Sequence, residues 1–188
     1  MTTHTETAQP ALVTLTVLKA ANAPKLGKRS AGMNIHYRLW TDEQRQEIYW
    51  QIAANDGGGQ HSLELVPTAK LESTLSPLAG KEPIRTRSLR STFAGRSTNN
   101  AGFIVCALYA EGFLSPSDKA HHHAVSEIDW NAWRQSCLSL PGQSVELPLA
   151  LATAALPADT ADPVPKGRRS GKRKLHAEEG EEAHAPAD

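Results

Sequence analysis

The stretch that decides the fold is Thr86–Leu114, which reads TRSLRSTFAGRSTNNAGFIVCALYAEGFL. Leu89 and Phe93 are spaced i, i+4 and predict a short helix with one apolar face, capped by Ser88 or by the threonine that opens the stretch. The dipeptide Ala94-Gly95 predicts a tight turn after this helix, because glycine has wide conformational freedom.

A longer helix is expected after the turn, with Ser97 or Thr98 as its cap. Ile104 and Leu108 are again four residues apart, and the helix is expected to end near Gly112, before a strand. A short helix, a turn and a longer helix are the layout of a helix-turn-helix, in which the second helix enters the major groove of DNA.

The run STNNAGFIVCALYAEGFL resembles the recognition helix of winged helix-turn-helix proteins, which often end in a Leu-x-x-x-Gly-hydrophobic-Leu pattern. Here that pattern runs from Leu108 to Leu114, and the resemblance extends over residues 67–130. It implies that the first turn of the helix faces base edges, where an Asn side chain suits adenine. The residues implied to read the bases are Arg96, Ser97, Thr98, Asn99 and Asn100.

Basic residues cluster just before this helix. Between positions 81 and 96 one acid, Glu82, accompanies Lys81, Arg85, Arg87, Arg90 and Arg96. Phosphate contacts from such side chains fix the position of a protein on DNA and make binding salt-dependent without specifying sequence. Contact with DNA, contact with another protein and a merely solvated helix face are all open for these residues.

The part before this motif predicts an antiparallel β-meander over residues 11–66. Alternating apolar residues indicate strands, and a segment rich in Gly, Pro and basic residues indicates a loop. The expected strands are 11–19, 34–40, 47–53 and 61–66, with the loop at 21–32. The run NDGGG at 55–59 predicts a hairpin tip, since Asn, Asp and Gly tolerate positive φ. A phosphate cradle is the alternative, disfavoured because the run joins two strands.

The part after the meander predicts helices around the central motif. Pro67 begins a short amphipathic helix that extends to Leu78. Residues 115–123 are expected to form a wing loop, with 124–128 as the return strand. Asp129 is expected to cap a last helix, in which Trp130, Trp133 and Cys137 fall at i, i+3, i+7. The two tryptophans are expected to seal the core, with stacking on bases as the alternative. Residues 145–155 are apolar and are candidates to pack back on the sheet.

The run His121-His122-His123 raises the question of a metal site. Consecutive residues point in different directions, and no Cys or carboxylate cluster lies nearby at ligand spacing, so zinc is disfavoured. A wing that touches phosphate and a solvated loop are the other two interpretations. No metal and no cofactor are therefore expected.

The last segment, 157–188, has blocks of like charge and is expected to be disordered. Four glutamates between 178 and 182 follow its basic block. The basic block, interpreted either as a nonspecific nucleic-acid anchor or as a solubilising tail, consists of Lys166, Arg168, Arg169, Lys172, Arg173 and Lys174.

Composition limits the class of protein. The 188 residues carry a formal net charge of zero, which argues against a uniformly basic surface. Cys106 and Cys137 lack CxxC spacing and are expected to be reduced. No apolar run approaches the roughly 20 residues of a membrane span. No signal peptide is evident at the N-terminus, so a cytoplasmic protein without membrane contact is expected.

These patterns predict an α+β protein, with an antiparallel β-meander, a winged helix-turn-helix-like helical half and a disordered charged tail. The expected parts are a disordered start at 1–10, the meander at 11–66, the helical half at 67–142, a packing segment at 143–156 and the tail at 157–188. A second resemblance, of NDGGGQHSLELVP and GRSTNNAGFIVCALYAEGFL, is to short proteins of bacterial plasmids and integrative conjugative elements. It implies a mobile-element setting and no particular activity.

Two functions are expected from these observations. No catalytic constellation or nucleotide motif is evident, so the first is a non-enzymatic DNA-binding accessory or regulatory protein that contacts duplex DNA. The second is a protein-interaction module that uses one face of the meander, formed by His36, Arg38, Trp40 and Tyr49. Palindromic sites would require a dimer, but no coiled-coil segment is evident, so the oligomeric state is open.

Overall fold

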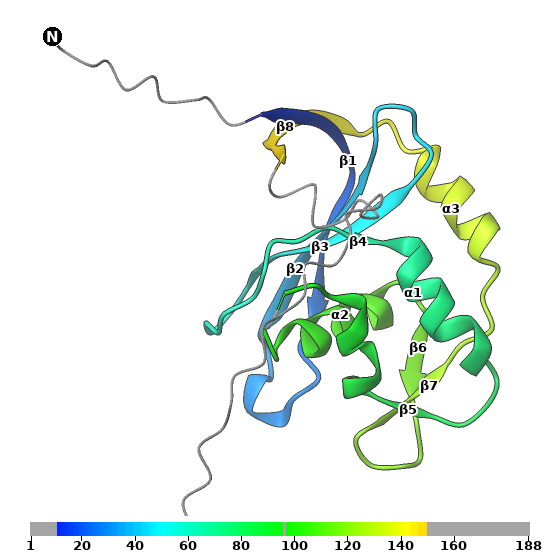
Figure 1. Cartoon of the computed structure of the whole chain (residues 1–188). Helices are drawn as coiled ribbons and strands as arrows, with labels where there is room; N and C mark the ends of the chain where they lie inside the picture. The colour runs from blue at the N-terminus through cyan, green and yellow to red at the C-terminus, as the bar shows by residue number, and fades with distance from the viewer. Residues whose placement is uncertain (1–10, 96, 150–188) are drawn as a thin grey trace, which may run out of the picture. The chain divides into compact units, whose positions relative to one another are not determined.

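The computed structural model describes residues 11–95 and 97–149, which form an α+β fold with two antiparallel sheets (Figure 1). The larger sheet has the order β4-β3-β2-β1-β8 and the smaller one the order β5-β7-β6. The strands are β1 (Leu12–Pro24), β2 (Asn34–Thr41), β3 (Ile48–Asn55), β4 (Val66–Pro67), β5 (Ile84–Arg85), β6 (Leu114–Pro116), β7 (His122–Val125) and β8 (Gln143–Pro148). The α+β class and the antiparallel N-terminal strands predicted from the sequence are confirmed.

Helices cover one face of the larger sheet. They are α1 (Thr68–Leu75), α2 (Asn100–Ala110) and α3 (Trp130–Leu138), with three 3₁₀ helices, η1 (Lys28–Ser30), η2 (Ser76–Leu78) and η3 (Thr86–Thr92). The central helix α2 contacts β1, β2 and β3 on one side and η3 and β6 on others. Helix α1 contacts η3, which in turn contacts α2, and the smaller sheet contacts α2 through β6. The expected recognition helix is therefore the core helix of this fold.

The main core lies between the larger sheet and these helices. Trp50 of β3 is fully buried and stacks on Trp133 of α3, with ring centroids 5.3 Å apart. Phe113 meets Trp50 edge-on at 5.8 Å and also contacts Trp130. Cys137 is buried in the same cluster. The prediction that the two tryptophans of the last helix seal the core is confirmed.

A second, smaller core lies on the opposite face of the larger sheet. It consists of Leu15, Trp40, Tyr49 and Leu65, with half-buried valines and a leucine of β1 and β8 around it. Strand β8 pairs with β1 along its whole length, from Leu12↔Pro148 to Val17↔Gln143. The expected packing of residues 145–155 on the sheet is confirmed for 145–148, which belong to β8, and the part of that segment from 150 on lies outside the described residues.

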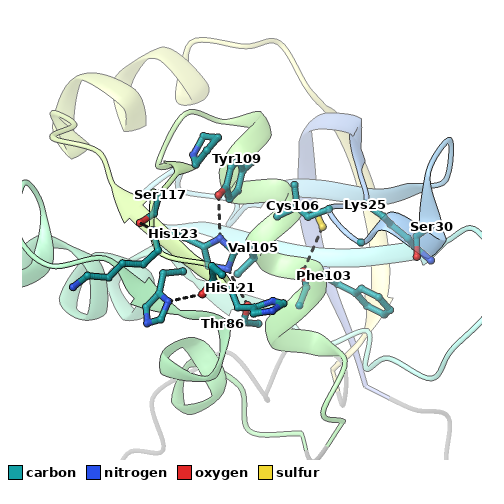
Figure 2. A pocket seen from close by; sticks show the side chains of 17 residues that line it. Lys25, Ser30, Thr86, Phe103, Val105, Cys106, Tyr109, Ser117, His121 and His123 are labelled. Carbon is teal, nitrogen blue, oxygen red and sulfur yellow. Dashed lines mark hydrogen bonds between the residues drawn. The ribbon is translucent and has the colours of Figure 1, made fainter.

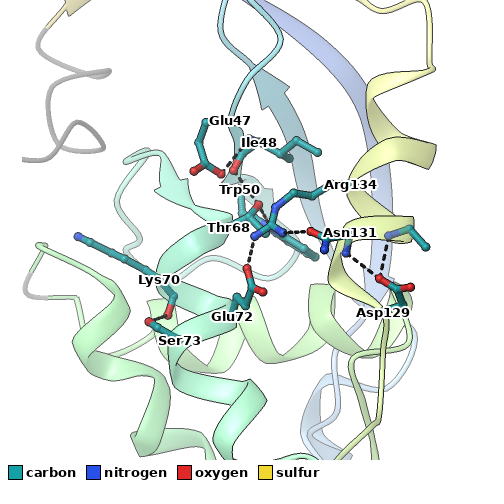
Figure 3. A network of polar contacts seen from close by, with 11 residues as sticks. Glu47, Ile48, Trp50, Thr68, Lys70, Glu72, Ser73, Asp129, Asn131 and Arg134 are labelled. Atoms are coloured by element: carbon teal, nitrogen blue, oxygen red, sulfur yellow. Dashed lines mark hydrogen bonds and ion pairs between the residues drawn. The ribbon is translucent and has the colours of Figure 1, made fainter.

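A polar network joins the sheet to α1 and α3 (Figure 3). The buried Thr68 hydroxyl donates to the carbonyl of Ile48 at 2.7 Å and accepts from the Trp50 indole N–H at 3.1 Å. Arg134 of α3 forms an ion pair with Glu72 of α1. Buried polar groups need such partners, because an unsatisfied one costs about 1–3 kcal/mol.

Two expected segment boundaries in the meander are wrong. The first strand does not end at Lys19, since Ala20–Pro24 pair with residues 34–38 of β2; only part of 21–32 is a loop. Residues 61–65 are not a strand. Their backbone groups bond to side chains instead, as when Ser62 N–H donates to Asn100 and the Leu63 carbonyl accepts from Gln51. The strand itself is limited to Val66–Pro67.

The helical half also differs from expectation in detail. The short helix is a seven-residue 3₁₀ helix, η3, and neither it nor α2 has a side-chain cap of the kind expected. The return strand of the hairpin was expected at 124–128 but is β7, which begins at His122. It pairs on one edge with β6 and on the other with β5. The cap of α3 is confirmed, since Asp129 Oδ1 accepts from the backbone N–H groups of Asn131 and Ala132, both at 3.0 Å.

Candidate nucleic-acid interface

A pocket of about 570 Å³ opens above α2, between the β1–β2 loop and the β6–β7 hairpin (Figure 2). Gly102, Phe103, Cys106 and Tyr109 lie on one face of α2 and form its floor. Figure 2 shows Lys25 and Ser30 on one side and Ser117 on the other, with the helix between them. The pocket thus joins three segments that are far apart in the sequence.

The charged residues that line this pocket are Lys25 and Lys119. Three consecutive histidines also line it, and among the described residues no Asp or Glu does. Exposed cations flank the lining segments along the chain. We call these the basic rim, which consists of Lys28, Arg29, Arg85, Arg87, Arg90 and Lys119. Asp118, in the β6–β7 turn, is the acid next to the last of them. Such a surface attracts anions.

A chain of hydrogen bonds fixes the hairpin against η3 and α2. Tyr109 Oη donates to the Ser115 carbonyl at 3.0 Å, so the phenol proton is used there. His123 Nδ1 lies 3.0 Å from Tyr109 Oη and therefore carries the proton, which leaves Nε2 to accept from Thr86 Oγ1 at 2.9 Å. Burial, with a smaller effect from His122, lowers the pKa of His123, which favours this neutral form.

Lys25 and Cys106 occupy the side of the pocket next to the β1–β2 loop. The Lys25 ammonium donates to Asn55 Oδ1 at 3.0 Å and to the Asp56 carbonyl, and it lies 5.5 Å from the centre of the Phe103 ring. Burial raises the pKa of the Cys106 thiol above its usual value. The thiol donates to the Gly102 carbonyl at 3.4 Å. A thiol held protonated in this way is a poor nucleophile.

The arginines expected to contact phosphate are all at the surface where the structure describes them. Arg85, Arg87 and Arg90 are exposed on β5 and η3, and Arg96 lies outside the described residues. Arg85 Nε donates to His122 Nε2 at 3.1 Å, which links β5 to β7 of the hairpin. Arg90 lines a second hollow, of about 290 Å³, at the start of α2.

The expectation that Asn100 reads a base is wrong for this structure. Its side chain is 1% exposed, accepts from Ser62 N–H at 3.1 Å and donates to Ser62 Oγ at 2.6 Å. Ser97 Oγ and Asn99 Nδ2 both donate to the Gln60 carbonyl, at 2.8 and 2.9 Å. Thr98 is exposed and lines the second hollow. The first turn of α2 therefore binds the segment 60–64 of its own chain.

The sequence did not lead us to expect a role for Glu64, whose buried carboxylate accepts hydrogen bonds at the turn before α2. It accepts from the backbone N–H groups of Ala94 and Gly95 at 3.0–3.2 Å and from Asn100 Nδ2 at 3.3 Å. An acid placed between two leucines, Leu63 and Leu65, was the available signal, since a charge is buried only where it is paired or hydrogen-bonded.

The three histidines diverge. His122 Nδ1 lies 2.8 Å from the Ala120 carbonyl, His123 points to Thr86 and Tyr109, and His121 is exposed with a φ of 60°. Within residues 11–95 and 97–149, no three His, Cys, Asp or Glu side chains are grouped so as to hold a metal ion. The basic block of the tail, 166–174, lies outside the described residues.

The strand face expected to dock a protein is largely unavailable. Trp40 is 1% and Tyr49 8% exposed, because both belong to the smaller core. His36 binds Asn22 and Asp56, with ring nitrogen distances of 2.8 and 2.9 Å. Arg38 alone is exposed. This set is wrong as a contact surface, since its two largest side chains are buried within the protein.

In the part of the chain that the structure describes, no helix is long and apolar enough to span a bilayer. A comparison of the chain with family models, with curated proteins and with solved structures finds no match in any of the three.

Proposed function

We propose that this chain is a DNA-binding protein that holds the phosphate backbone with its basic rim. The single observation that carries the proposal is that the β1–β2 loop, η3 and the β6–β7 hairpin all carry exposed cations and all contribute residues to one pocket, which no carboxylate among the described residues lines. Lys and Arg side chains on phosphates supply most of the nonspecific affinity of DNA-binding proteins.

The order of the elements supports the same proposal. Helix α1, strand β5, helix η3, helix α2 and strands β6 and β7 follow one another, and β5 lies beside β7 in the smaller sheet. A three-helix unit with a hairpin next to its third helix is what the winged helix-turn-helix resemblance implies. In this interpretation the β6–β7 hairpin is the wing and places Lys119 beside the DNA.

The binding mode that fits the geometry is contact with phosphates and little reading of bases. The amide of Asn100 is engaged inside the protein, and the outward face of α2 presents Gly102, Phe103 and Tyr109 to the pocket. None of these three resembles the paired amides and guanidinium groups that recognise base edges. We therefore expect similar affinity for duplexes of different sequence.

The test is fluorescence anisotropy with random-sequence duplex DNA and single charge reversals. Arg87→Glu and Arg90→Glu are expected to weaken binding, whereas Arg38→Glu, an equal charge change at an exposed position on the opposite face of the larger sheet, is expected to have little effect. Equal losses in all three variants would show that net charge alone, and not this surface, attracts the DNA.

A further inference from the structure

Gly102 has no packing reason to be glycine. It lies in α2 without a positive φ, and a Cβ placed on it would meet no atom within 4 Å apart from its chain neighbours and the backbone of its own helix. Glycine is unfavourable in helices because its backbone loses the most freedom on folding. The other glycines with such open surroundings, Gly32, Gly58 and Gly112, have positive φ, which explains them. Gly102 alone of these leaves a bare stretch of helix backbone, and that stretch is on the floor of the pocket.

A bare helix backbone at the bottom of a pocket allows a flat ligand to approach closely. The volume of about 570 Å³ lies within the range of small-molecule sites. Leu26, Val105 and the rings of Phe103 and Tyr109 give the interior an apolar character. An apolar body would lie on these side chains, and negative charge attached to it would lie at Lys119 and the basic rim.

A nucleotide has this combination of a flat base and an attached phosphate. In duplex DNA the base is stacked and paired and is not free to enter a pocket. Proteins that hold single strands combine a basic groove for the backbone with aromatic side chains for the bases. The pocket has both parts, at a scale that suits one base.

We propose that the pocket above Gly102 receives one unpaired nucleotide, so that DNA with a single-stranded end or segment is the preferred ligand. The inference rests on the proposed function, because the basic rim holds the neighbouring phosphates. A nucleotide in the pocket adds a second contribution to the binding free energy, which blunt duplex DNA cannot make because its bases are paired.

The test compares a blunt duplex with the same duplex carrying a short thymidine overhang, both labelled and titrated with the full-length protein. Wild-type protein is expected to bind the overhang form roughly 5- to 150-fold more tightly, the factor that corresponds to one stacked base. Gly102→Leu places a side chain on the floor of the pocket, where the base would lie, and is expected to bring the two affinities together while leaving the affinity for the blunt duplex unchanged. Ala110→Leu, which adds the same side chain to α2 at an exposed position outside the pocket lining, should keep the preference.

A second measurement needs no variant. A fluorescent purine analogue placed in the overhang is expected to change its emission when the wild-type protein binds, and the same analogue within the duplex is not. Excess free thymidine monophosphate distinguishes a free nucleotide from a nucleotide within a strand as the ligand. If it competes and removes only the overhang preference, the pocket holds a single nucleotide. If it does not compete, the adjoining strand is required for binding. Either result supports an unpaired nucleotide as the ligand.

The outcomes distinguish the two proposals. Equal wild-type affinity for the blunt and overhang forms, with no emission change, would overturn the pocket inference and leave phosphate binding by the basic rim intact. An overhang preference that survives in folded Gly102→Leu protein would also overturn it. Failure to bind either DNA would overturn the proposed function and this inference together.

Discussion

The side chain of Asn100 donates a hydrogen bond to the carboxylate of Glu64, 36 positions earlier in the chain, at 3.3 Å. The same carboxylate accepts from the backbone of Ala94 and Gly95, so one buried acid fixes the turn between η3 and α2. Because of this contact, the start of the expected recognition helix packs inside the protein and does not form a surface that could read DNA.

Glu64→Gln is expected to lower the free energy of unfolding by about 1–3 kcal/mol, because the neutral amide offers one acceptor and places a donor against the N–H groups it must satisfy. Urea denaturation measures the change. Glu82→Gln, at an exposed position, removes the same charge and serves as the control. A loss no larger than that of the control would show that the Glu64 network does not stabilise the fold.

Asp129→Ala is expected to destabilise the protein by about 1 kcal/mol, since it removes the side-chain cap of α3. The midpoint of urea denaturation is the measurement, with Asp118→Ala in the exposed hairpin turn as the matched loss of an acid. If both variants unfold at the same urea concentration, the cap contributes nothing measurable.

His123 is expected to make stability depend on pH. Burial lowers its pKa in the folded protein from the ordinary value of 6.5, so just below pH 6.5 the unfolded chain binds a proton that the folded chain does not. Its contribution to stability is fully present above that pH and is lost as the pH falls below it. Denaturation at about pH 7.5 and about pH 5.5 measures the effect.

The control for this pH effect is the neighbouring exposed histidine. His123→Gln is expected to flatten the dependence between the two pH values, and His121→Gln is expected to leave it as in the wild type. Unchanged pH dependence in His123→Gln would contradict the neutral, hydrogen-bonded state that links Thr86, His123 and Tyr109.

Gly102→Ala is expected to raise the free energy of unfolding by about 0.5 kcal/mol, the lower end of the usual glycine-to-alanine gain in a helix because Gly102 is in the first turn of α2. Thermal unfolding measures this change in stability. Ala110→Gly, the opposite substitution at an exposed position of the same helix, serves as the comparison. A loss of stability in Gly102→Ala would mean that the open space above this residue is filled in solution by the protein itself.

Local sequence signals were sufficient for most elements. Period-two alternation located β2 and β3, leucine spacing located α1, and Asp129 marked the start of α3. These signals depend on neighbours in the chain and on general burial, which a single sequence carries. The α+β class followed from them.

The errors share a physical cause, which is contact between residues far apart in the chain. Residues 61–65 alternate as a strand does, but the Ser62 N–H donates to the side chain of Asn100 and the Leu63 carbonyl accepts from the side chain of Gln51. Asn100 appears exposed from its place at a helix start, and only tertiary packing buries it. The basic rim was predicted in part: the arginines of η3 formed an evident cluster, whereas the β1–β2 loop joins them only through the fold.

The most direct test of the account is the salt dependence of duplex binding by full-length protein whose tail block, 166–174, has been neutralised by Lys→Gln and Arg→Gln substitutions. We expect that this protein still binds and that the logarithm of its affinity falls linearly with the logarithm of the salt concentration. We also expect Arg87→Glu to reduce the slope by about 1. If the tail-neutral protein does not bind, or if its slope is unchanged by Arg87→Glu, the basic rim is not the surface that holds DNA.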